Sequence, residues 1–159
     1  MENIKYYMYL SEYDYEADDK TSGFKDLEVD FAGLKYSKCV GLDTKGSIKN
    51  RYQEDYADAD GVRIYIGENA TRKATDVTFT FFFVDTATSN RRDVYDSFCE
   101  YISSGIIYYH DTARKKQAKL CLLDALKPSE DVYNGSIKYI SADFKFTNLW
   151  GQCKNININ

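Results

Sequence analysis

Hydrophobic and polar residues alternate most regularly in the segment from Thr75 to Val84, TDVTFTFFFV. Because successive side chains of a β-strand point to opposite faces, this alternation predicts a strand with one buried face. The residues expected on the buried face are Val77, Phe79, Phe81 and Phe83. Phe82 and Val84 interrupt the polar face near its end. We therefore expect this end of the second face to be covered too, by a helix, by another sheet or by a neighbouring subunit.

A helix is predicted directly after this strand, over residues 90–104. Ser89 or Asn90 can cap its first turn, where the carboxylate of Asp93 interacts favourably with the helix dipole. Gly105 supplies the permissive residue that often follows a last helical turn. Between these limits the apolar residues recur with helical spacing and predict the buried face. They are Val94, Tyr95, Phe98, Tyr101 and Ile102.

Shorter alternating or apolar segments predict the other strands, several of them joined as hairpins. These strands are expected at Asp26–Phe31, Lys35–Val40, Val62–Ile66, Ile106–Tyr109, Ala118–Leu123 and Ser136–Thr147. Gly33 marks the turn between the first two, and the polar segment HDTARKKQ joins the two strands that follow the helix. In the last strand the apolar residues change parity, and a β-bulge near Tyr139 would reconcile the two sets.

The composition agrees with a fold made mainly of strands. The chain has 159 residues, of which 43% are hydrophobic, with 15 Tyr and 9 Phe. Aromatic side chains suit pleated sheets, and this length is typical of one domain. We therefore expect a mainly β (α+β) fold, a β-sandwich of antiparallel strands flanked by the one helix, in a single domain over residues 1–159. A long polar loop is expected near residues 11–22, and an extended loop or weak strand near residues 41–61.

The net charge and the absence of sorting signals reduce the range of functions and locations to be expected. The formal net charge is −4, which argues against sequence-independent binding of duplex DNA, since that binding depends on Lys and Arg neutralising phosphates. The N-terminus has no basic flank followed by an apolar run, and no stretch approaches the roughly 20 apolar residues of a membrane span. We expect a soluble protein that is made in the cytoplasm and has no membrane partner.

Metal-binding patterns are incomplete in this sequence. The cysteines lie far apart without a C-x-x-C pair, so we expect free, partly buried thiols. They are Cys39, Cys99, Cys121 and Cys153. The segment YADADG spaces its acidic residues as an EF-hand loop does, but Tyr56 takes the first ligand position and Gly67 the twelfth. An Asp-rich turn before a strand is the simpler interpretation, so no metal site is expected, although the sequence leaves open whether residues 55–60 bind a cation.

Catalytic patterns are incomplete as well. His110 is the single histidine and could act as a general base beside Asp111, but no Ser or Cys has the context of a nucleophile elbow. A histidine at the tip of a hairpin is the simpler interpretation. The nine glycines are spread singly and form no phosphate-binding loop. We therefore expect no enzyme activity and no cofactor.

The order of these elements resembles that of tail proteins of long-tailed bacteriophages, in particular the distal tail and tail-tube-like components of phages and prophages. The resemblance covers most of the chain, and the helix segment RRDVYDSFCEYISSG is the best match. In such proteins a helix with a Tyr-Asp-aromatic stretch is followed by a glycine and by a strand that ends in a Y-x-D-like turn. Here these features are Tyr95-Asp96-Ser97-Phe98, Gly105 and Tyr109-His110-Asp111.

The resemblance implies a structural component of a virion tail, synthesised in the cytoplasm of the bacterial host. Its copies would assemble into a ring, commonly a hexamer, around a channel through which DNA passes without specific binding. They would also contact other tail proteins. The partly apolar strand faces and a short basic pair give the candidate assembly interface. Its residues are Phe82, Val84, Tyr65, Arg91 and Arg92.

Two other classes of function stay open. A Tyr-rich β-sandwich could bind carbohydrate or protein, because aromatic rings offer a stacking surface. An enzyme would need residues that folding brings together, such as His110 with a distant Asp. Glycan binding by the isolated chain would favour the first of these two classes.

Overall fold

The computed structural model describes most of the chain. The described residues are 6–10, 24–49, 51–55, 62–66, 71–103, 105–111, 113–123, 126–129, 132–135 and 137–155. Within them the chain forms eleven β-strands and one α-helix. The strands are β1 (Tyr6–Leu10), β2 (Phe24–Asp26), β3 (Leu34–Val40), β4 (Arg51–Asp55), β5 (Val62–Ile66), β6 (Thr75–Val84), β7 (Ile106–Asp111), β8 (Lys116–Leu122), β9 (Val132–Asn134), β10 (Ile137–Asn148) and β11 (Lys154–Asn155). The helix is α1 (Arg91–Ser103).

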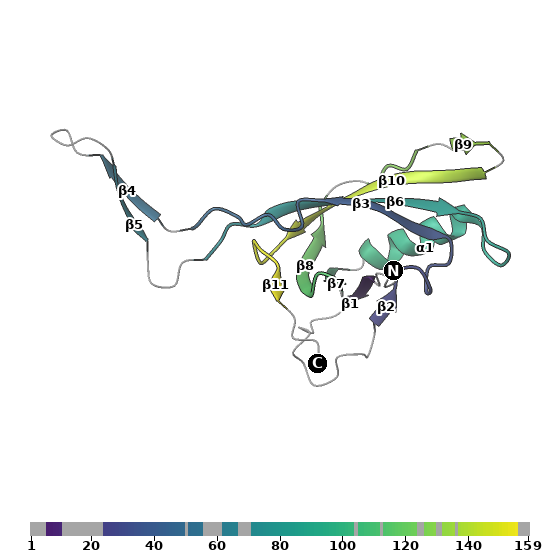
Figure 1. Cartoon of the computed structure of the whole chain (residues 1–159), viewed down its shortest axis with the longest axis horizontal. Coiled ribbons are helices and arrows are strands. Elements are labelled where there is room, and N and C mark those ends of the chain that lie inside the picture. The colour runs from purple at the N-terminus through teal and green to yellow at the C-terminus, as the bar shows by residue number, and fades with distance from the viewer. Residues whose placement is uncertain are drawn as a thin grey trace.

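Nine of these strands form one curled antiparallel sheet. Its order is β2-β1-β7-β8-β10-β6-β3, with β9 beside β10 and β11 beside β8. Figure 1 shows β3, β6 and β10 as a long upper layer, with β1, β2, β7 and β8 below it and α1 beneath the upper layer. The predicted mainly β fold with one flanking helix is confirmed.

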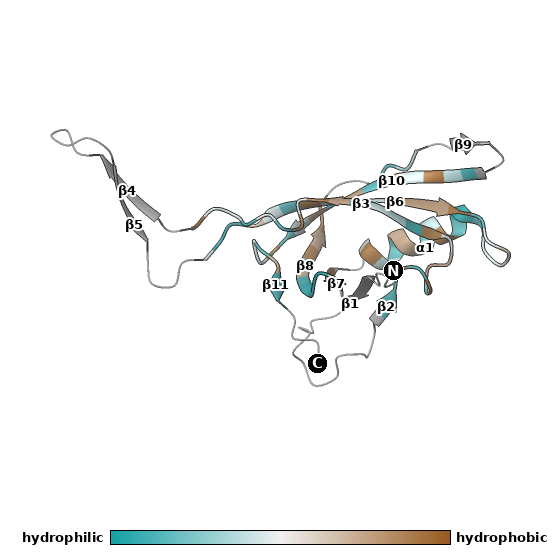
Figure 2. Ribbon diagram, in the orientation of Figure 1, coloured by the Kyte–Doolittle hydropathy of each residue, from teal (hydrophilic) through white to brown (hydrophobic). Residues whose placement is uncertain are grey.

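The core lies between the curled sheet and α1. β6 has the predicted bounds, and the residues predicted for its buried face each have 0% of their surface exposed. The ring of Phe98 in α1 packs against them, with its centroid 5.4 Å from that of Phe81 and 5.1 Å from that of Phe144 in β10. Figure 2 shows the hydrophobic colour along β6. Aromatic side chains from three elements therefore fill one continuous core.

The start of α1 is fixed by side chains that accept hydrogen bonds from its first turn. Oδ1 of Asn90 accepts a hydrogen bond from the backbone N–H of Arg92 at 2.9 Å, as a capping residue does. Oδ1 of Asp85 accepts one from the backbone N–H of Arg91 at 2.8 Å. All five residues predicted for the buried face of the helix are buried. The predicted helix and the side that it buries are confirmed.

The strand predicted over Asp26–Phe31 is wrong, because β2 ends at Asp26 and the residues after it form turns. Oδ1 of Asp26 accepts hydrogen bonds from the backbone N–H groups two and three residues further on, at 3.0 and 3.3 Å. Such local side-chain bonds favour a turn over a strand. Leu27 and Phe31 lie four residues apart and are both buried, whereas Val29 is 73% exposed. The buried spacing is that of a helical turn.

The bulge predicted near Tyr139 is also wrong. β10 pairs with β6 in an uninterrupted register over ten residue pairs, from Tyr139 to the end of the strand. Tyr139 lies on the outer face of the sheet, where its ring contacts that of Phe82 with centroids 5.3 Å apart. The register shift of the upper layer lies in β3, between Tyr36 and Lys38. An outward-facing aromatic pair thus explains the change of parity.

β4 and β5 form a separate two-stranded antiparallel sheet. Within the described residues these two strands pair only with each other, and we call this hairpin the arm, which Figure 1 labels as β4 and β5. β5 has the predicted bounds, and β4 is a strand within the segment 41–61. The rest of the described chain is called the body.

Two short segments, residues 44–49 and 71–74, join the arm to the body, and we call them the base of the arm. Backbone hydrogen bonds of 2.7 and 2.8 Å connect one segment to the other. The N–H of Gly46 donates to the carbonyl oxygen of Gly151 at 2.7 Å, which connects the base to the segment after β10. A Cβ at Gly46 would lie 1.8 Å from the carbonyl oxygen of Lys73, so only glycine allows the chains to approach so closely.

Two of the sequence predictions fall outside the described residues. They are the polar loop at residues 11–22 and most of the Asp-rich segment 55–60. Within the described part of the chain, no helix is long and apolar enough to cross a lipid bilayer.

Candidate assembly surface

The outer face of the upper layer is formed by alternate residues of β3, β6 and β10. The register sets two rows across these strands, Lys35, Phe82 and Ser141, and then Lys38, Thr80 and Asp143. Oγ1 of Thr80 donates a hydrogen bond to Oδ1 of Asp143 at 2.5 Å. Further along the face, Nζ of Lys145 lies 3.9 Å from Oδ2 of Asp76. Polar groups on this face therefore pair across neighbouring strands.

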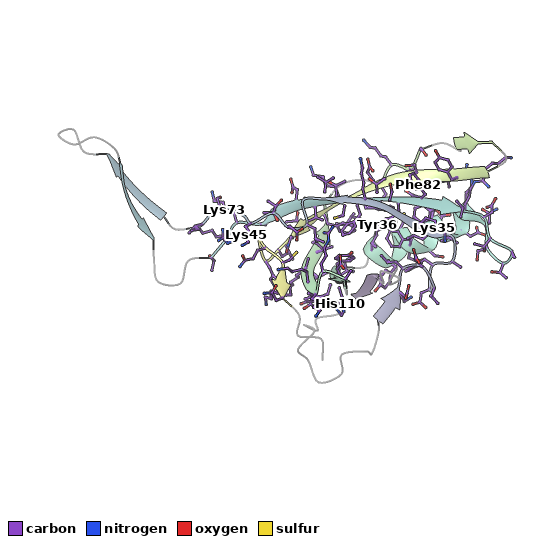
Figure 3. All side chains as sticks on the ribbon, in the orientation of Figure 1. Lys35, Tyr36, Lys45, Lys73, Phe82 and His110 are labelled. Atoms are coloured by element: carbon purple, nitrogen blue, oxygen red, sulfur yellow. The ribbon has the colours of Figure 1, made fainter. Side chains whose placement is uncertain are left out.

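A small apolar area interrupts this face at one end. It consists of Phe82, Val84 and Tyr139, all of which are half-buried. The rings of α1 contact Phe81 and Phe83, which point to the inner face of β6. The helix of the same chain therefore does not supply the cover that the sequence predicts for Phe82 and Val84. Figure 3 shows Phe82 and Lys35 on the upper layer.

The other predicted interface residues lie apart from this area. Arg91 begins α1, and its Nη1 lies 2.9 Å from Oδ2 of Asp85, with only 12% of its side chain exposed. This arginine holds the turn between β6 and α1. Arg92 is exposed beside it. Tyr65 lies on β5 of the arm, opposite Tyr52 of β4. The structure thus places the five residues on the sheet, at the helix start and on the arm.

A hollow lies where α1 begins, beside the turn that follows β2. Its volume is about 290 Å³. The lining residues come from residues 30–32, from the segment before α1 and from the first turns of the helix, and they include the carboxylates of Asp30 and Asp93. The remaining polar groups of the lining are hydroxyls and one amide. They belong to Thr88, Ser89, Asn90 and Ser97. The hollow therefore offers an acidic, oxygen-rich surface.

His110 is not at a hairpin tip, and that prediction is wrong. It lies inside β7, paired with Tyr7 of β1 and Gln117 of β8, and only 4% of its surface is exposed. The prediction failed because β7 and β8 extend further into the polar connecting segment than their apolar residues indicate. Burial lowers the pKa of His110, although the carboxylate of Asp111 opposes this shift. The imidazole is therefore held in its neutral form.

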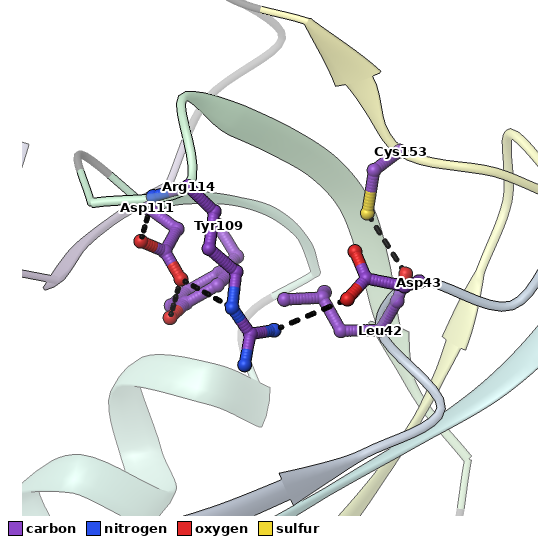
Figure 4. A network of polar contacts seen from close by, with 6 residues as sticks. All are labelled: Leu42, Asp43, Tyr109, Asp111, Arg114 and Cys153. Carbon is purple, nitrogen blue, oxygen red and sulfur yellow. Dashed lines mark hydrogen bonds and ion pairs between the residues drawn. The ribbon is translucent and has the colours of Figure 1, made fainter.

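Asp111 closes the connection between β7 and β8, as Figure 4 shows. Its Oδ1 accepts a hydrogen bond from the backbone N–H of Arg114 at 3.0 Å, and the hydroxyl of Tyr109 donates to its Oδ2 at 3.4 Å. The guanidinium of Arg114 lies 3.7 Å from Asp111 and 3.7 Å from Asp43. The carboxylate beside the single histidine thus serves to join this turn to the segment that follows β3.

The cysteines are free and partly buried, as the sequence predicts. Sγ of Cys153 donates to the carbonyl oxygen of Leu42 at 2.9 Å. Burial raises the pKa of Cys39 to about 12 and that of Cys153 to about 11. Both thiols are therefore protonated at neutral pH, which makes them poor nucleophiles and poor metal ligands. Among the described residues, no group of three or more His, Cys, Asp or Glu is placed to hold a metal ion.

The base of the arm carries positive charge that sequence reasoning did not single out. Lys45, Lys49 and Lys73 are exposed there, and Figure 3 shows Lys45 and Lys73 close to the start of the arm. Nη1 of Arg72 donates to the carbonyl oxygen of Gly46 at 2.9 Å. These cations come from two segments on either side of β4 and β5. The backbone hydrogen bonds between the two segments bring them together.

Comparisons with known proteins give similarities to solved structures and no match to a family model or a curated sequence. Among solved structures, the chain is similar to the crystal structure of the Dit (gp 19.1) protein of SPP1, described as a paradigm of the hub adsorption apparatus in phages that infect Gram-positive bacteria. The sequence identity is 11% and the TM-score is 0.49. The similarity covers 88% of this chain and 49% of that chain, so this chain spans about half the length of the Dit protein.

Proposed function

We propose that this chain is a structural component of a bacteriophage or prophage tail, and that its copies assemble into a ring around the DNA channel. The arm is the observation that carries the proposal. β4 and β5 pair with each other and belong to a sheet of their own. A two-stranded hairpin is marginally stable in water unless it packs against something else. Because its strands pair only with each other among the described residues, the arm would be stabilised by packing on a neighbouring copy.

The kind of assembly follows from the shape of such a contact. In the proposed ring the arm of each copy packs on a different part of the next copy, so the contact is heterologous. Heterologous contacts produce closed rings when the rotation closes and filaments when it does not. A ring, commonly of six copies, is the form that the sequence resemblance to phage tail proteins implies. The order on which this resemblance rests is present as β6, α1, Gly105 and β7.

The remaining parts of the proposal concern partners and location. The protein would be made in the cytoplasm of the bacterial host and would reside in the virion tail, where rings stack on other tail proteins. The net charge of −4 suits a channel that DNA crosses without being held, because acidic walls do not neutralise phosphates. No catalytic step or cofactor is part of this role.

Shortening the arm tests the proposal. The backbone N–H of Lys49 donates to the carbonyl oxygen of Thr71 at 2.7 Å, so an Asn-Gly turn can replace residues 50–70 and join two paired positions. A matched control replaces only residues 56–61 by Asn-Gly and keeps β4 and β5. Light scattering over a range of concentrations and negative-stain images give the size and shape of the particles.

The wild type and the control are expected to form rings, and the arm-less variant is expected to remain a folded monomer by circular dichroism. A wild type that stays monomeric at all concentrations would contradict self-assembly. Rings formed equally well by the arm-less variant would show that the arm has no part in it.

A carbohydrate- or protein-binding module is the alternative. Such a module needs exposed aromatic faces, and the single tryptophan does not present one. Nζ of Lys154 lies 3.9 Å from the ring centroid of Trp150, and the ring of Tyr108 lies 5.7 Å away. Binding of the isolated chain to a glycan array would revive this alternative.

A further inference from the structure

The exposed cations at the base of the arm have no partner within the described part of their own chain. They are Lys45, Lys49 and Lys73. The described carboxylates nearest in sequence are engaged elsewhere, since Asp43 lies 3.7 Å from Arg114 and Asp76 lies 3.9 Å from Lys145. In a protein with a net charge of −4, a set of unpaired cations at one site calls for a partner of opposite charge.

An opposite set of charges lies on α1. Asp93, Asp96 and Glu100 are exposed and follow one another at spacings of three and four residues, so they share one face of the helix. Asp96 and Glu100 are like charges four residues apart, which disfavours the helix. The last turn of α1 contains no basic residue that would relieve this repulsion. No ion pair to these three carboxylates occurs among the described residues.

The acidic face continues into the hollow at the start of α1. Asp93 lines this hollow together with Asp30, and its volume of about 290 Å³ is ample for a lysine side chain. The face is therefore both charged and shaped to receive extended cations from another molecule.

The two charged surfaces lie on opposite sides of the body. Figure 3 shows Lys45 and Lys73 where the arm begins, and Figure 1 shows α1 on the side of the body away from the arm. One chain therefore cannot bring its own lysines to its own α1. Two copies can, when the base of the arm of one copy meets α1 of the next.

We propose that the base of the arm in one copy docks against the acidic face of α1 in a second copy of this chain, with Lys45, Lys49 and Lys73 facing Asp93, Asp96 and Glu100. The inference rests on the proposed self-assembly and names the surfaces that meet. In the proposed ring each copy uses one surface toward each neighbour, so the contact is head to tail and can be repeated. Because the contact is electrostatic, it weakens as salt screens the charges.

Charge reversal tests the docking. The basic-end variant carries Lys45→Glu and Lys73→Glu, and the acidic-end variant carries Asp96→Lys and Glu100→Lys. All four positions are exposed, so these changes leave the core intact. A matched control, Lys115→Glu with Lys127→Glu, has the same charge change as the basic-end variant at exposed positions that belong to neither set of charges.

Each one-ended variant is expected to assemble at least about tenfold more weakly than the wild type and the control, since both partners in every contact then carry the same sign. An equimolar mixture of the two variants restores assembly, because copies that alternate around a ring present opposite charges at every contact. The chain with all four substitutions also assembles with itself. Recovery in these two cases excludes misfolding as the cause of the loss.

The outcomes separate this inference from the proposed function. If both one-ended variants form rings as readily as the wild type does, the proposed docking is wrong, whereas the proposal of self-assembly is unaffected. Failure of the mixture and of the fourfold variant to recover would overturn it as well. A wild type that stays monomeric would overturn both proposals.

Discussion

The body and the arm are stabilised in opposite ways. In the body, β6 contributes four side chains that have 0% of their surface exposed, and α1 packs aromatic rings against them. In the arm, β4 and β5 have only each other as hydrogen-bonded partners in their sheet. Burial of apolar surface is the main force that holds a fold together, and a hairpin alone buries little. The body is therefore complete as a single chain, whereas the arm is not.

This difference indicates where function lies. A region that is stable by itself has no need of a neighbour. Burial in the core accounts for the pattern of apolar residues in the body. The arm and the charged base that carries it are the parts that the proposed assembly would explain. Substitutions that act on one region and leave the other unchanged therefore test the division.

The largest effect is expected from Phe98→Ala, which breaks the body. The ring of Phe98 is fully buried and lies 5.2 Å from that of Phe31 in the turn after β2. Removing a buried phenylalanine costs about 3–5 kcal/mol in the free energy of unfolding. Urea unfolding followed by circular dichroism measures this loss. Phe82→Ala, on the half-buried outer face, is the matched control and should lower stability much less while weakening self-association. Equal losses in the two variants would contradict the assignment of faces.

A smaller effect is expected from Gly46→Ala, which breaks the joint between the regions. The added methyl group would meet the carbonyl oxygen of Lys73 at 1.8 Å, so the two segments of the base must separate. Crowding of this kind costs roughly 1–3 kcal/mol. Amide hydrogen exchange should show faster exchange at the base and unchanged protection in β6. Ser47→Ala, at the exposed next position, should leave exchange as it is in the wild type.

A still smaller effect is expected from pH, and it belongs to the body alone. Burial holds the pKa of His110 below its usual value of 6.5, so the folded chain favours the neutral imidazole. The resulting stabilisation is complete above the unfolded pKa and is lost as the pH falls below it towards the folded pKa. The free energy of unfolding should therefore decrease from about pH 7.5 to about pH 5.5. His110→Gln should remove this part of the decrease, and an identical pH profile for that variant would refute the assignment.

The smallest effect concerns the rate at which thiols react and not the stability of the fold. Because burial raises the pKa of Cys39 to about 12 and of Cys153 to about 11, very little thiolate is present at pH 8. Both thiols should react slowly with an aromatic disulfide reagent in the folded protein and quickly in urea. Cys39→Ser and Cys153→Ser identify the slow phases by removing them one at a time. Fast reaction of either thiol in the folded chain would mean that this part of the body opens readily.

The sequence predicted the elements whose burial follows a simple period. The apolar spacing of β6 and α1 identified their buried residues, and for α1 the capping residue and Gly105 identified its ends. The strand at Asp26–Phe31 failed because side-chain hydrogen bonds of Asp26 decided the backbone conformation against the alternating pattern. His110 was misplaced because both faces of β7 are buried, and burial on both faces removes the alternation by which a strand is recognised.

The candidate assembly surface could be predicted only in part from the sequence. Phe82 and Val84 were visible as apolar residues on a polar face, and they do lie half-exposed on the outer face of the sheet. The basic base of the arm was not visible, since its lysines are separated by β4 and β5 in the sequence. Recognising the pairing of these two strands first would have brought the charges together.

The hydrogen bond between Gly46 and Gly151 has a mechanical consequence. It links the base of the arm to the segment that follows β10. β10 has twelve residues and is the longest of the described strands. Because residue 74 directly precedes β6, a pull on the arm reaches β6 through the covalent chain, and it reaches the segment after β10 through this hydrogen bond. β10 is held by β6 over ten residue pairs, which a force along the strand must shear together and cannot unzip one by one. In the proposed ring, tension between neighbouring copies would thus be borne by the longest ladder of the sheet.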